Sequence, residues 1–562
     1  METMRGAELT IRLLERQGIR TIAGIPGGAN LPLYDALFKS TTIKHVLTRH
    51  EQGAGFLAQG IARSTGEAAV CFATSGPGAT NVLTAIADAY LDSIPVVCIT
   101  GQVPLSMIGT DAFQEVDTYG MTIPITKHNY LVRSVEELLQ VIPHAFRLAL
   151  SGRPGPVVVD IPKDIQMAEI EIAEWPDPGC RDIPVQAEGP ALEVAAGMIN
   201  AAKRPILCLG GGIIHGNATR CARMFVEKGN IPTTMTLMGL GTLPSDNPLS
   251  LGMLGMHAAR STNMILEECD LFISAGARFD DRATGKLMEF CPDANVIHMD
   301  IDPSEVSKLR AANVGLVGDV RLSLEALLPL IEEKGRESWL YRVASLKRRY
   351  PMADTVELIP EKPYGLILKT AEMVQDCALV ATDVGKHQMW TAQVYPFDKP
   401  RQLLTSGGLG TMGFGLPAAI GASLANPGKR VLCFTGDGSL QMNIQELATA
   451  VEQQVNVTII IMNNNSLGLV RQQQHLFYSA NHFASDFQID IDFAVIARGF
   501  GMRSYNVGAD GSLVDILVTA LNEPGPCLVN VPIGREEEVY PMVPPGAANI
   551  EMIGGVNAKQ PA

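Results

Sequence analysis

Short apolar runs of strand length alternate with helix-length amphipathic segments along most of this chain. The apolar runs lie at 68–73, 94–100, 205–209, 271–274, 296–299, 430–435 and 457–462. Many of them end in glycine-rich turns, and helical spacing follows. Buried strands that alternate with helices predict an α/β fold built on doubly wound parallel sheets.

One helix is expected between the last two runs, over Leu440–Val451. Met442 and Leu447 fall at helical spacing on its apolar face, whereas Glu446 and Glu452 are expected to face outward. The local order is therefore strand, loop, helix, strand and loop.

Size and composition restrict the class of protein. At 562 residues the chain is too long for one core, and its net charge of −15 argues against nucleic acid or anionic membranes as partners. The 10 cysteines form no C-x-x-C pair, and those at 71, 98, 208 and 433 lie in apolar segments, which indicates reduced, buried thiols in a cytoplasmic protein. No apolar run reaches membrane-spanning length, and an amphipathic helix around Ile11 begins so early that we expect no signal or transit peptide.

Two linker-like stretches divide the chain into three doubly wound parallel-sheet domains. The first is rich in proline and glycine (174–190), and the second is a charged, proline-bearing connection (334–364). We expect domains at 1–172, 190–335 and 360–535, and a C-terminal tail at 536–562.

Polar residues follow two neighbouring strands of the third segment. Gly436-Asp437-Gly438-Ser439 comes after one run, and Asn463-Asn464-Asn465 comes after the next. In an open parallel sheet, ligands bind at the edge where the strands end. A carboxylate, an amide oxygen and a backbone carbonyl suit Mg²⁺ holding a diphosphate, although Asp-Gly alone is also a common turn signal.

The spacing of these two motifs resembles the thiamine diphosphate (ThDP) signature, in which GDG is followed about thirty residues later by NN. The resemblance implies that Asp437 and Asn464 are metal ligands and that the main chain of Ser466 is the third.

A second set of motifs lies in the first segment. Glu51 follows a short strand, Lys44–Leu47, and opens an apolar helix, a position that also favours an acid for electrostatic reasons alone. In ThDP enzymes a glutamate hydrogen-bonds the pyrimidine ring and stabilises its imino tautomer, so that the cofactor activates itself. The turn Ser75–Asn81, which could be turn chemistry only, matches the pyrimidine-side loop of these enzymes.

Taken together, the motifs resemble the catalytic large subunits of acetolactate (acetohydroxyacid) synthases over nearly the whole chain. They occur in family order at 24–28, 49–54, 75–81, 101–104, 110–115, 152–156 and 161–164. The resemblance implies that pyruvate is decarboxylated on ThDP and that the hydroxyethyl carbanion adds to a second pyruvate or to 2-ketobutyrate. The products, 2-acetolactate and 2-aceto-2-hydroxybutyrate, belong to the first common step of branched-chain amino-acid biosynthesis.

The same resemblance assigns residues to the reacting centre and to ThDP. The catalytic candidates are Glu51, Gly28, Gln114 and Lys163. The candidates that bind ThDP are Glu51, Pro77, Asn81, Gly385, His387, Met412, Gly436, Asp437, Gly438 and Ser439. The candidates for the substrate channel are Pro104, Phe113, Arg282 and Gln473.

A flavin is implied for the central segment. The glycines at 210–212 lack the spacing of a dinucleotide fingerprint, and charge-dense loops such as 276–282 are often only solvated sheet edges. As a set they resemble the FAD domain of the family, with arginines suited to the pyrophosphate. The implied FAD ligands are Arg153, Gly211, Met256, His257, Arg278, Asp300, Glu305 and Asp319. This flavin is structural, because joining two keto acids transfers no net electrons.

The chain departs from the family at two positions. Lys386 stands where Gln is usual, which leaves its contact with the diphosphate open. Gln473 stands where most members carry the Trp that packs on the extra methyl group of 2-ketobutyrate. One methylene is worth about 1–3 kcal/mol in a pocket. We therefore expect a weak preference and mainly 2-acetolactate, which leads to valine and leucine rather than isoleucine.

The resemblance also implies partners, and it leaves rivals. Glu51 and the metal site usually lie on opposite chains in this superfamily, so we expect a homodimer at least, with a small regulatory subunit. The rivals are a flavin-free catabolic acetolactate synthase, a pyruvate oxidase and a glyoxylate carboligase, the last disfavoured by Glu51. A non-catalytic binding protein of the same fold is disfavoured because Glu51, Asp437 and Asn464 are all present.

Overall fold

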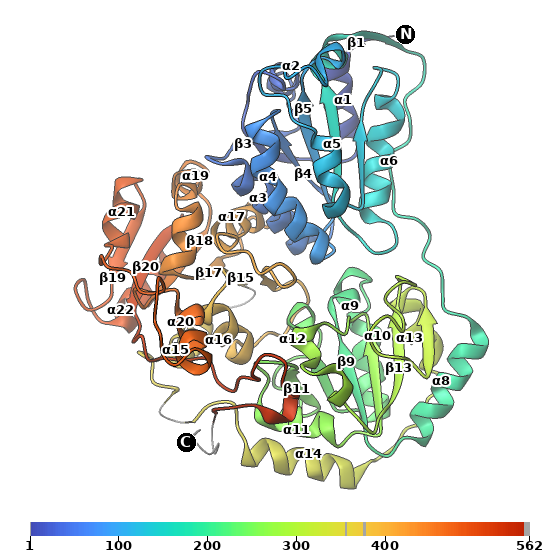
Figure 1. Ribbon diagram of the computed structural model, residues 1–562, viewed down its shortest axis with the longest axis vertical. Helices are drawn as coiled ribbons and strands as arrows, with labels where there is room; N and C mark the ends of the chain where they lie inside the picture. Colours follow the sequence, from blue (N-terminus) through green and yellow to red (C-terminus); the bar gives the residue numbers. More distant parts are fainter. Residues whose placement is uncertain (1, 355–356, 375–377, 556–562) are drawn as a thin grey trace.

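Three parallel sheets of six strands each, one in each third of the chain, form the framework (Figure 1). The computed structural model describes residues 2–354, 357–374 and 378–555, so the expected tail lies outside the described residues beyond 555. The predicted class, three doubly wound α/β domains, is confirmed. None of the helices in the described part of the chain is long and apolar enough to cross a bilayer.

The first domain has the strand order β3-β2-β4-β5-β7-β6. A two-stranded antiparallel pair, β1 (Glu2–Arg5) with β8 (Glu169–Ile172), joins its beginning to its end. Its sheet strands are β2 (Thr21–Gly24), β3 (Lys44–Leu47), β4 (Ala69–Ala73), β5 (Val96–Gln102), β6 (His128–Leu131) and β7 (Val157–Pro162). Its helices are α1 (Gly6–Arg16), α2 (Leu31–Phe38), α3 (Glu51–Thr65), α4 (Pro77–Leu91), α5 (Thr118–Thr122), α6 (Leu138–Leu150) and α7 (Lys163–Met167), with short 3-10 turns η1 (Leu105–Met107) and η2 (Ile123–Ile125).

The central domain has the order β11-β10-β9-β12-β13-β14. Its strands are β9 (Pro205–Leu209), β10 (Thr233–Met235), β11 (Ser250–Met253), β12 (Leu271–Ala275), β13 (Asn295–Asp300) and β14 (Val314–Val317). Its helices are α8 (Gly189–Ala201), α9 (Gly211–His215), α10 (Thr219–Gly229), α11 (Arg260–Glu267), α12 (Asp281–Thr284) and α13 (Val320–Leu327), with η3 (Leu237–Gly239) and η4 (Leu287–Glu289).

The third domain has the order β16-β15-β17-β18-β20-β19. Its strands are β15 (Leu379–Thr382), β16 (Leu403–Leu404), β17 (Val431–Gly436), β18 (Val457–Asn463), β19 (Arg503–Asn506) and β20 (Cys527–Pro532). Its helices are α15 (Pro363–Met373), α16 (Lys386–Val394), α17 (Gly415–Ala425), α18 (Asp437–Leu440), α19 (Glu446–Glu452), α20 (Gly468–Phe477), α21 (Phe493–Gly499) and α22 (Leu513–Asn522), with η5 (Gln441–Asn443) before α19 and η6 (Asn549–Glu551) near the end of the described chain.

Two expectations about local structure were wrong. The helix predicted over 440–451 is divided into α18, η5 and α19, and this break exposes half of Met442 and buries Glu446 completely. The connection predicted at 334–364 contains a helix, α14 (Glu337–Arg349), which packs on the central domain through Trp339 and its apolar neighbours.

The first and third domains pack closely along α3 and α17 (Figure 1). A Cβ on Gly60 would lie 2.0 Å from the Ala418 carbonyl oxygen, and one on Gly421 would lie 2.0 Å from the Leu57 carbonyl oxygen. Glycine at 60 and 421 is therefore required for this approach of the two backbones.

A buried charge network joins the same two domains. The Arg63 guanidinium lies 3.1 Å from the Asp88 carboxylate and 2.8 Å from the Asp92 carboxylate, and all three side chains are at most 4% exposed. Both acids also hold the loop 406–411 of the third domain. Asp92 accepts the backbone N–H groups of Gly407 and Gly408, and Asp88 accepts the hydroxyls of Ser406 and Thr411. The loop that precedes Met412 is thus fixed by α3 and α4.

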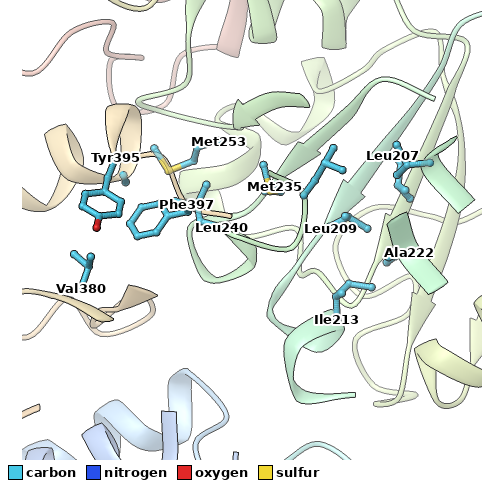
Figure 2. Packing of buried hydrophobic residues seen from close by; sticks show 14 of the residues in the cluster. Leu207, Leu209, Ile213, Ala222, Met235, Leu240, Met253, Val380, Tyr395 and Phe397 are labelled. Atoms are coloured by element: carbon cyan, nitrogen blue, oxygen red, sulfur yellow. The ribbon is translucent and has the colours of Figure 1, made fainter. Parts of the chain in front are cut away.

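One apolar core continues from the central domain into the third (Figure 2). Leu207 lies in the central sheet, and Leu240 and Met253 lead from it toward Tyr395 and Phe397, whose rings are 4.7 Å apart. Core side chains shared in this way fix the third domain against the central one.

The segment after β20 returns to the central domain. Ala548 forms a β-bridge with Gly285, and Met542 forms one with Ile553. The Asn263 amide donates to the Asn549 carbonyl, and Arg260 donates to the Met552 carbonyl. This part of the expected tail is therefore packed structure.

The cysteines agree with the prediction of reduced thiols. All nine described cysteines are free, and Cys180 alone among them is exposed.

Candidate active site

The three predicted metal ligands come together at the ends of β17 and β18. The Asp437 carboxylate accepts the Ser466 amide at 3.0 Å and the Asn464 amide at 3.4 Å. The Asn464 side-chain oxygen accepts the Ser466 amide at 3.2 Å and the Ser466 hydroxyl at 3.1 Å. Burial raises the pKa of Asp437 to about 6. Burial destabilises a carboxylate in its charged form, and a bound cation would offset this cost. This cluster of oxygen atoms therefore fits Mg²⁺.

Gly385 and Gly436 pack closely against the His387 ring, and we call these three residues the glycine wall. Gly385 has φ +152°, and a Cβ placed on it would lie 2.9 Å from the His387 ring, as would one on Gly436. His387 is buried, its Nε2 has no hydrogen-bond partner among the described residues, and burial lowers its pKa to about 3. A buried ring nitrogen without a partner is rare, and an anionic ligand placed here would supply one.

Three further residues singled out from the sequence lie in neighbouring segments. Lys386 is buried, and its Nζ donates to the Glu537 carbonyl at 2.6 Å, while burial lowers its pKa to about 8. Met412 is half-buried at the start of the turn before α17, next to Gly413, whose N–H donates to Asp383 at 2.8 Å. Ser439 is fixed by its hydroxyl, which donates to the Val384 carbonyl at 2.7 Å.

Glu51 begins α3 in the first domain and is only 8% exposed. Its carboxylate accepts the Asn81 amide at 3.0 Å, so two predicted ThDP ligands from the ends of β3 and β4 are in contact. Among the described residues, no hydrogen bond joins this carboxylate to Asp437, Asn464 or Ser466.

The other predicted residues of the first domain surround the same sheet edge. Gln114, with φ +60°, packs over Gly76, where a Cβ would lie 2.9 Å from its backbone oxygen. Asp164, beside Lys163, accepts the backbone N–H of the residue after Pro104 at 3.2 Å. Gly28 lies in an exposed turn, Pro77 is exposed at the start of α4, and Phe113 is 87% exposed.

The predicted FAD ligands lie at the carboxyl edge of the central sheet. Arg153 reaches them from the first domain and forms ion pairs with Glu305 at 2.9 Å and Asp302 at 3.4 Å. Burial raises the pKa of Asp300 to about 6. An arginine can donate to a phosphate, and the neighbouring carboxylates can accept hydrogen bonds from hydroxyl groups, so this edge fits a ligand that carries both.

The remaining flavin candidates follow neighbouring strands. Gly211 begins α9 after β9, and Asp319 caps α13 by accepting the Leu322 amide at 3.0 Å. His257 is buried with its Nδ1 3.3 Å from the Pro541 carbonyl, and burial lowers its pKa to about 4. The Met256 sulfur lies 3.7 Å from the Arg282 guanidinium. Arg278 follows β12 and is half-buried.

The substrate candidate Gln473 is half-buried on α20. Its neighbour Gln472 is buried and exchanges hydrogen bonds with both backbone groups of Val539, at 2.9 and 3.0 Å. The helix that carries Gln473 is thereby attached to the returning C-terminal segment.

Sequence reasoning missed three residues that shape the site. Asp88 and Asp92 hold the loop before Met412, and Glu446 lies against the first turn of α3. No local pattern marks the two aspartates, because their partners in the third domain are more than three hundred residues away.

Three models of the thiamine pyrophosphate enzymes match the three domains in order. The N-terminal TPP binding domain matches residues 4–121, the central domain matches 192–327, and the C-terminal TPP binding domain matches 383–531.

Curated relatives match nearly the whole chain. The acetolactate synthase isozyme 1 large subunit of Escherichia coli is 59% identical over 549 residues, which cover 98% of this chain and 97% of the relative. The isozyme 2 large subunit of the same organism is 46% identical, with 98% and 99% covered. The chloroplastic acetolactate synthase of Arabidopsis thaliana is 44% identical, with 98% and 84% covered.

Proposed function

The chain belongs to the acetolactate synthase large subunits, which are thiamine pyrophosphate enzymes, and from this premise we propose that it is the catalytic subunit of an acetolactate synthase. It joins the decarboxylated residue of pyruvate to a second pyruvate or to 2-ketobutyrate, in branched-chain amino-acid biosynthesis. The observation that carries the proposal is the pair of half-sites at two sheet edges: Glu51 with Asn81, and Asp437 with Asn464 and Ser466.

Each of these two groups of residues has a role that follows from its chemistry. ThDP, when bound, supplies the carbanion chemistry that releases carbon dioxide and forms the new carbon–carbon bond. Glu51 holds a proton between its carboxylate and the pyrimidine ring, and Asn81 keeps that carboxylate oriented. Asp437, Asn464 and the main chain of Ser466 would hold Mg²⁺, whose charge would bind a diphosphate, and the glycines around His387 would let the backbone approach it.

Side chains of the first and central domains handle the substrates. Gln114 donates to the oxygen that becomes negative when the second keto acid is attacked, and Lys163 and Arg282 attract the carboxylates. Gly28 borders open space, since a Cβ there would meet no atom within 4 Å. Pro104 and Phe113 line an apolar approach.

FAD and Mg²⁺ are part of this proposal. The support for FAD is the approach of Arg153 to the carboxylates at the edge of the central sheet. A flavin held by Arg153 and the central domain would have a structural role, because the reaction needs no electron acceptor.

The proposed assembly is a homodimer or a larger oligomer with a small regulatory subunit, in the cytoplasm. The support for the small subunit is the relatives' designation as large subunits. A second chain would bring the complementary half-site to each centre.

Product analysis tests the function. In air and with inorganic phosphate present, the purified chain receives ThDP, Mg²⁺, FAD and equal amounts of pyruvate and 2-ketobutyrate, and its products and flavin spectrum are recorded. We expect 2-acetolactate as the main product and a flavin that stays oxidised. Acetyl phosphate or a reduced flavin would identify a pyruvate oxidase, and full activity without bound FAD would identify a flavin-free synthase.

Gln473→Trp tests the proposed specificity residue. The larger ring would pack on the extra methyl group of 2-ketobutyrate and raise its use relative to pyruvate by about 10-fold or more. The measurement is the ratio of the two products from an equimolar mixture. Gln473→Leu serves as the control, since it removes the amide without adding a ring, and an unchanged ratio in the Trp variant would place the specificity elsewhere.

A further inference from the structure

Glu446 is a fully buried acid in a position where the helical pattern predicted solvent. It is the first residue of α19, and its carboxylate accepts the backbone N–H of Arg49 at 2.9 Å and the Thr449 hydroxyl at 2.6 Å. An amide of His50 also donates toward it. A buried carboxylate that binds main-chain amides of another domain has a specific structural task.

The atoms around this carboxylate belong to the beginning of α3. Arg49 and His50 are the two residues before that helix, and Glu51 is its first residue. A Cβ on Gly53 would lie 2.6 Å from the Glu446 carboxylate oxygen, so this oxygen lies directly against the first turn. The first turn of a helix has unpaired N–H groups and a partial positive charge, and both favour a carboxylate at this position.

Other contacts of Arg49 support the same end of α3. The Arg49 guanidinium pairs with Glu452 at the other end of α19 and donates to the Leu47 carbonyl at 2.6 Å. The Glu452 contact is largely exposed, whereas the Glu446 contact is buried. Glu446 is therefore the member of this group that fixes the backbone position of the helix start.

We propose that Glu446 is a positioning residue for Glu51. Its carboxylate holds residues 49–53 in place and so keeps the Glu51 side chain at the distance and angle that the pyrimidine ring requires. The inference rests on the proposed function, in which Glu51 is the activating acid. It also explains why position 53 is glycine, because any side chain there would displace the carboxylate.

Two variants perturb this contact from opposite sides. Glu446→Ala removes the carboxylate, and Gly53→Ala pushes it away from the helix. In both, we expect proton exchange at the thiazolium carbon of bound ThDP, followed by NMR in D₂O, to slow by about 10²-fold, the cost of roughly 1 Å of misplacement. The turnover number should fall in parallel, with the KM for pyruvate and the ThDP affinity nearly unchanged. In the cofactor-free protein, amide hydrogen exchange of residues 49–55 should become faster.

Conservative and matched variants separate positioning from general stability. Glu446→Gln keeps an oxygen acceptor for the Arg49 amide and should retain most of the proton-exchange rate. Glu452→Ala removes the exposed partner of the Arg49 side chain and should leave the proton-exchange rate at ThDP and the turnover number unchanged. If Glu446→Ala does not fold, Gly53→Ala supplies the same test.

The possible results distinguish this inference from the proposed function. Wild-type proton exchange in Glu446→Ala or Gly53→Ala, beside a strong loss in Glu51→Gln, would overturn the role of Glu446 alone. Wild-type proton exchange in Glu51→Gln would instead overturn the assigned role of Glu51. A fall in thermal stability without slower proton exchange would show that Glu446 only joins the domains.

Discussion

Glu51→Gln is expected to reduce turnover by about 10²–10⁴-fold, the range that a positioned proton-transfer group contributes. The amide has nearly the same shape as the carboxylate, but it cannot hold a proton at the pyrimidine ring in the same way. Because Asn81 can turn its side-chain oxygen toward the new amide, the local packing should survive. Steady-state acetolactate formation measures the loss, and titration calorimetry measures ThDP binding, which should change little.

Two comparisons make this result specific. Glu452→Gln replaces an exposed acid on α19 and should leave turnover unchanged. Glu51→Asp keeps the charge and shortens the side chain, so it should show an intermediate loss. Normal turnover in Glu51→Gln would remove Glu51 from the mechanism, and loss of ThDP affinity alone would make it a binding residue.

Arg63→Met is expected to lower the free energy of unfolding by about 3–5 kcal/mol, because it leaves buried carboxylates without their cation. Asp88 and Asp92 are at most 1% exposed, and Arg63 is their shared ionic partner. Methionine fills a similar space without a charge. The loss of stability therefore measures the cost of leaving the two carboxylates without a cation rather than the cost of a cavity. Denaturant-induced unfolding followed by circular dichroism measures it.

Removing the charges together is the matching control for Arg63→Met. In a variant that also carries Asp88→Asn and Asp92→Asn, no unpaired charge remains, and much of the stability should return. Arg12→Met, at an exposed site on α1, should have no measurable effect. If the triple variant is as unstable as the single one, packing of Arg63 on Phe414 is the more important contribution.

The sequence allowed the strands and the polar residues at their ends to be predicted well. The runs at 205–209 and 457–462 fall on β9 and β18, and Lys44–Leu47 is β3. Parallel strands end at one edge of a sheet, so strand prediction alone placed Asp437 beside Asn464. Their roles, and the three domain boundaries, stay predictions.

Contacts between residues far apart in the sequence could not be predicted from local patterns. Helical periodicity over 440–451 assigned Glu446 to solvent, because nothing nearby in the sequence shows that α3 covers it. The helix α14 could have been found, since Trp339, Val343 and Leu346 follow helical spacing, but nearby prolines and charges suggested a linker. The Arg63 network gave no signal, because its partners in the third domain follow over three hundred residues later.

The return of residues 541–553 to the central domain has a consequence for protein synthesis. Asn263 and Gly285 leave the ribosome long before their partners Asn549 and Ala548 are made. At about 5–20 residues per second, this interval lasts on the order of tens of seconds. During that time the nascent central domain carries an uncovered surface that is closed only after residues 541–553 have been made.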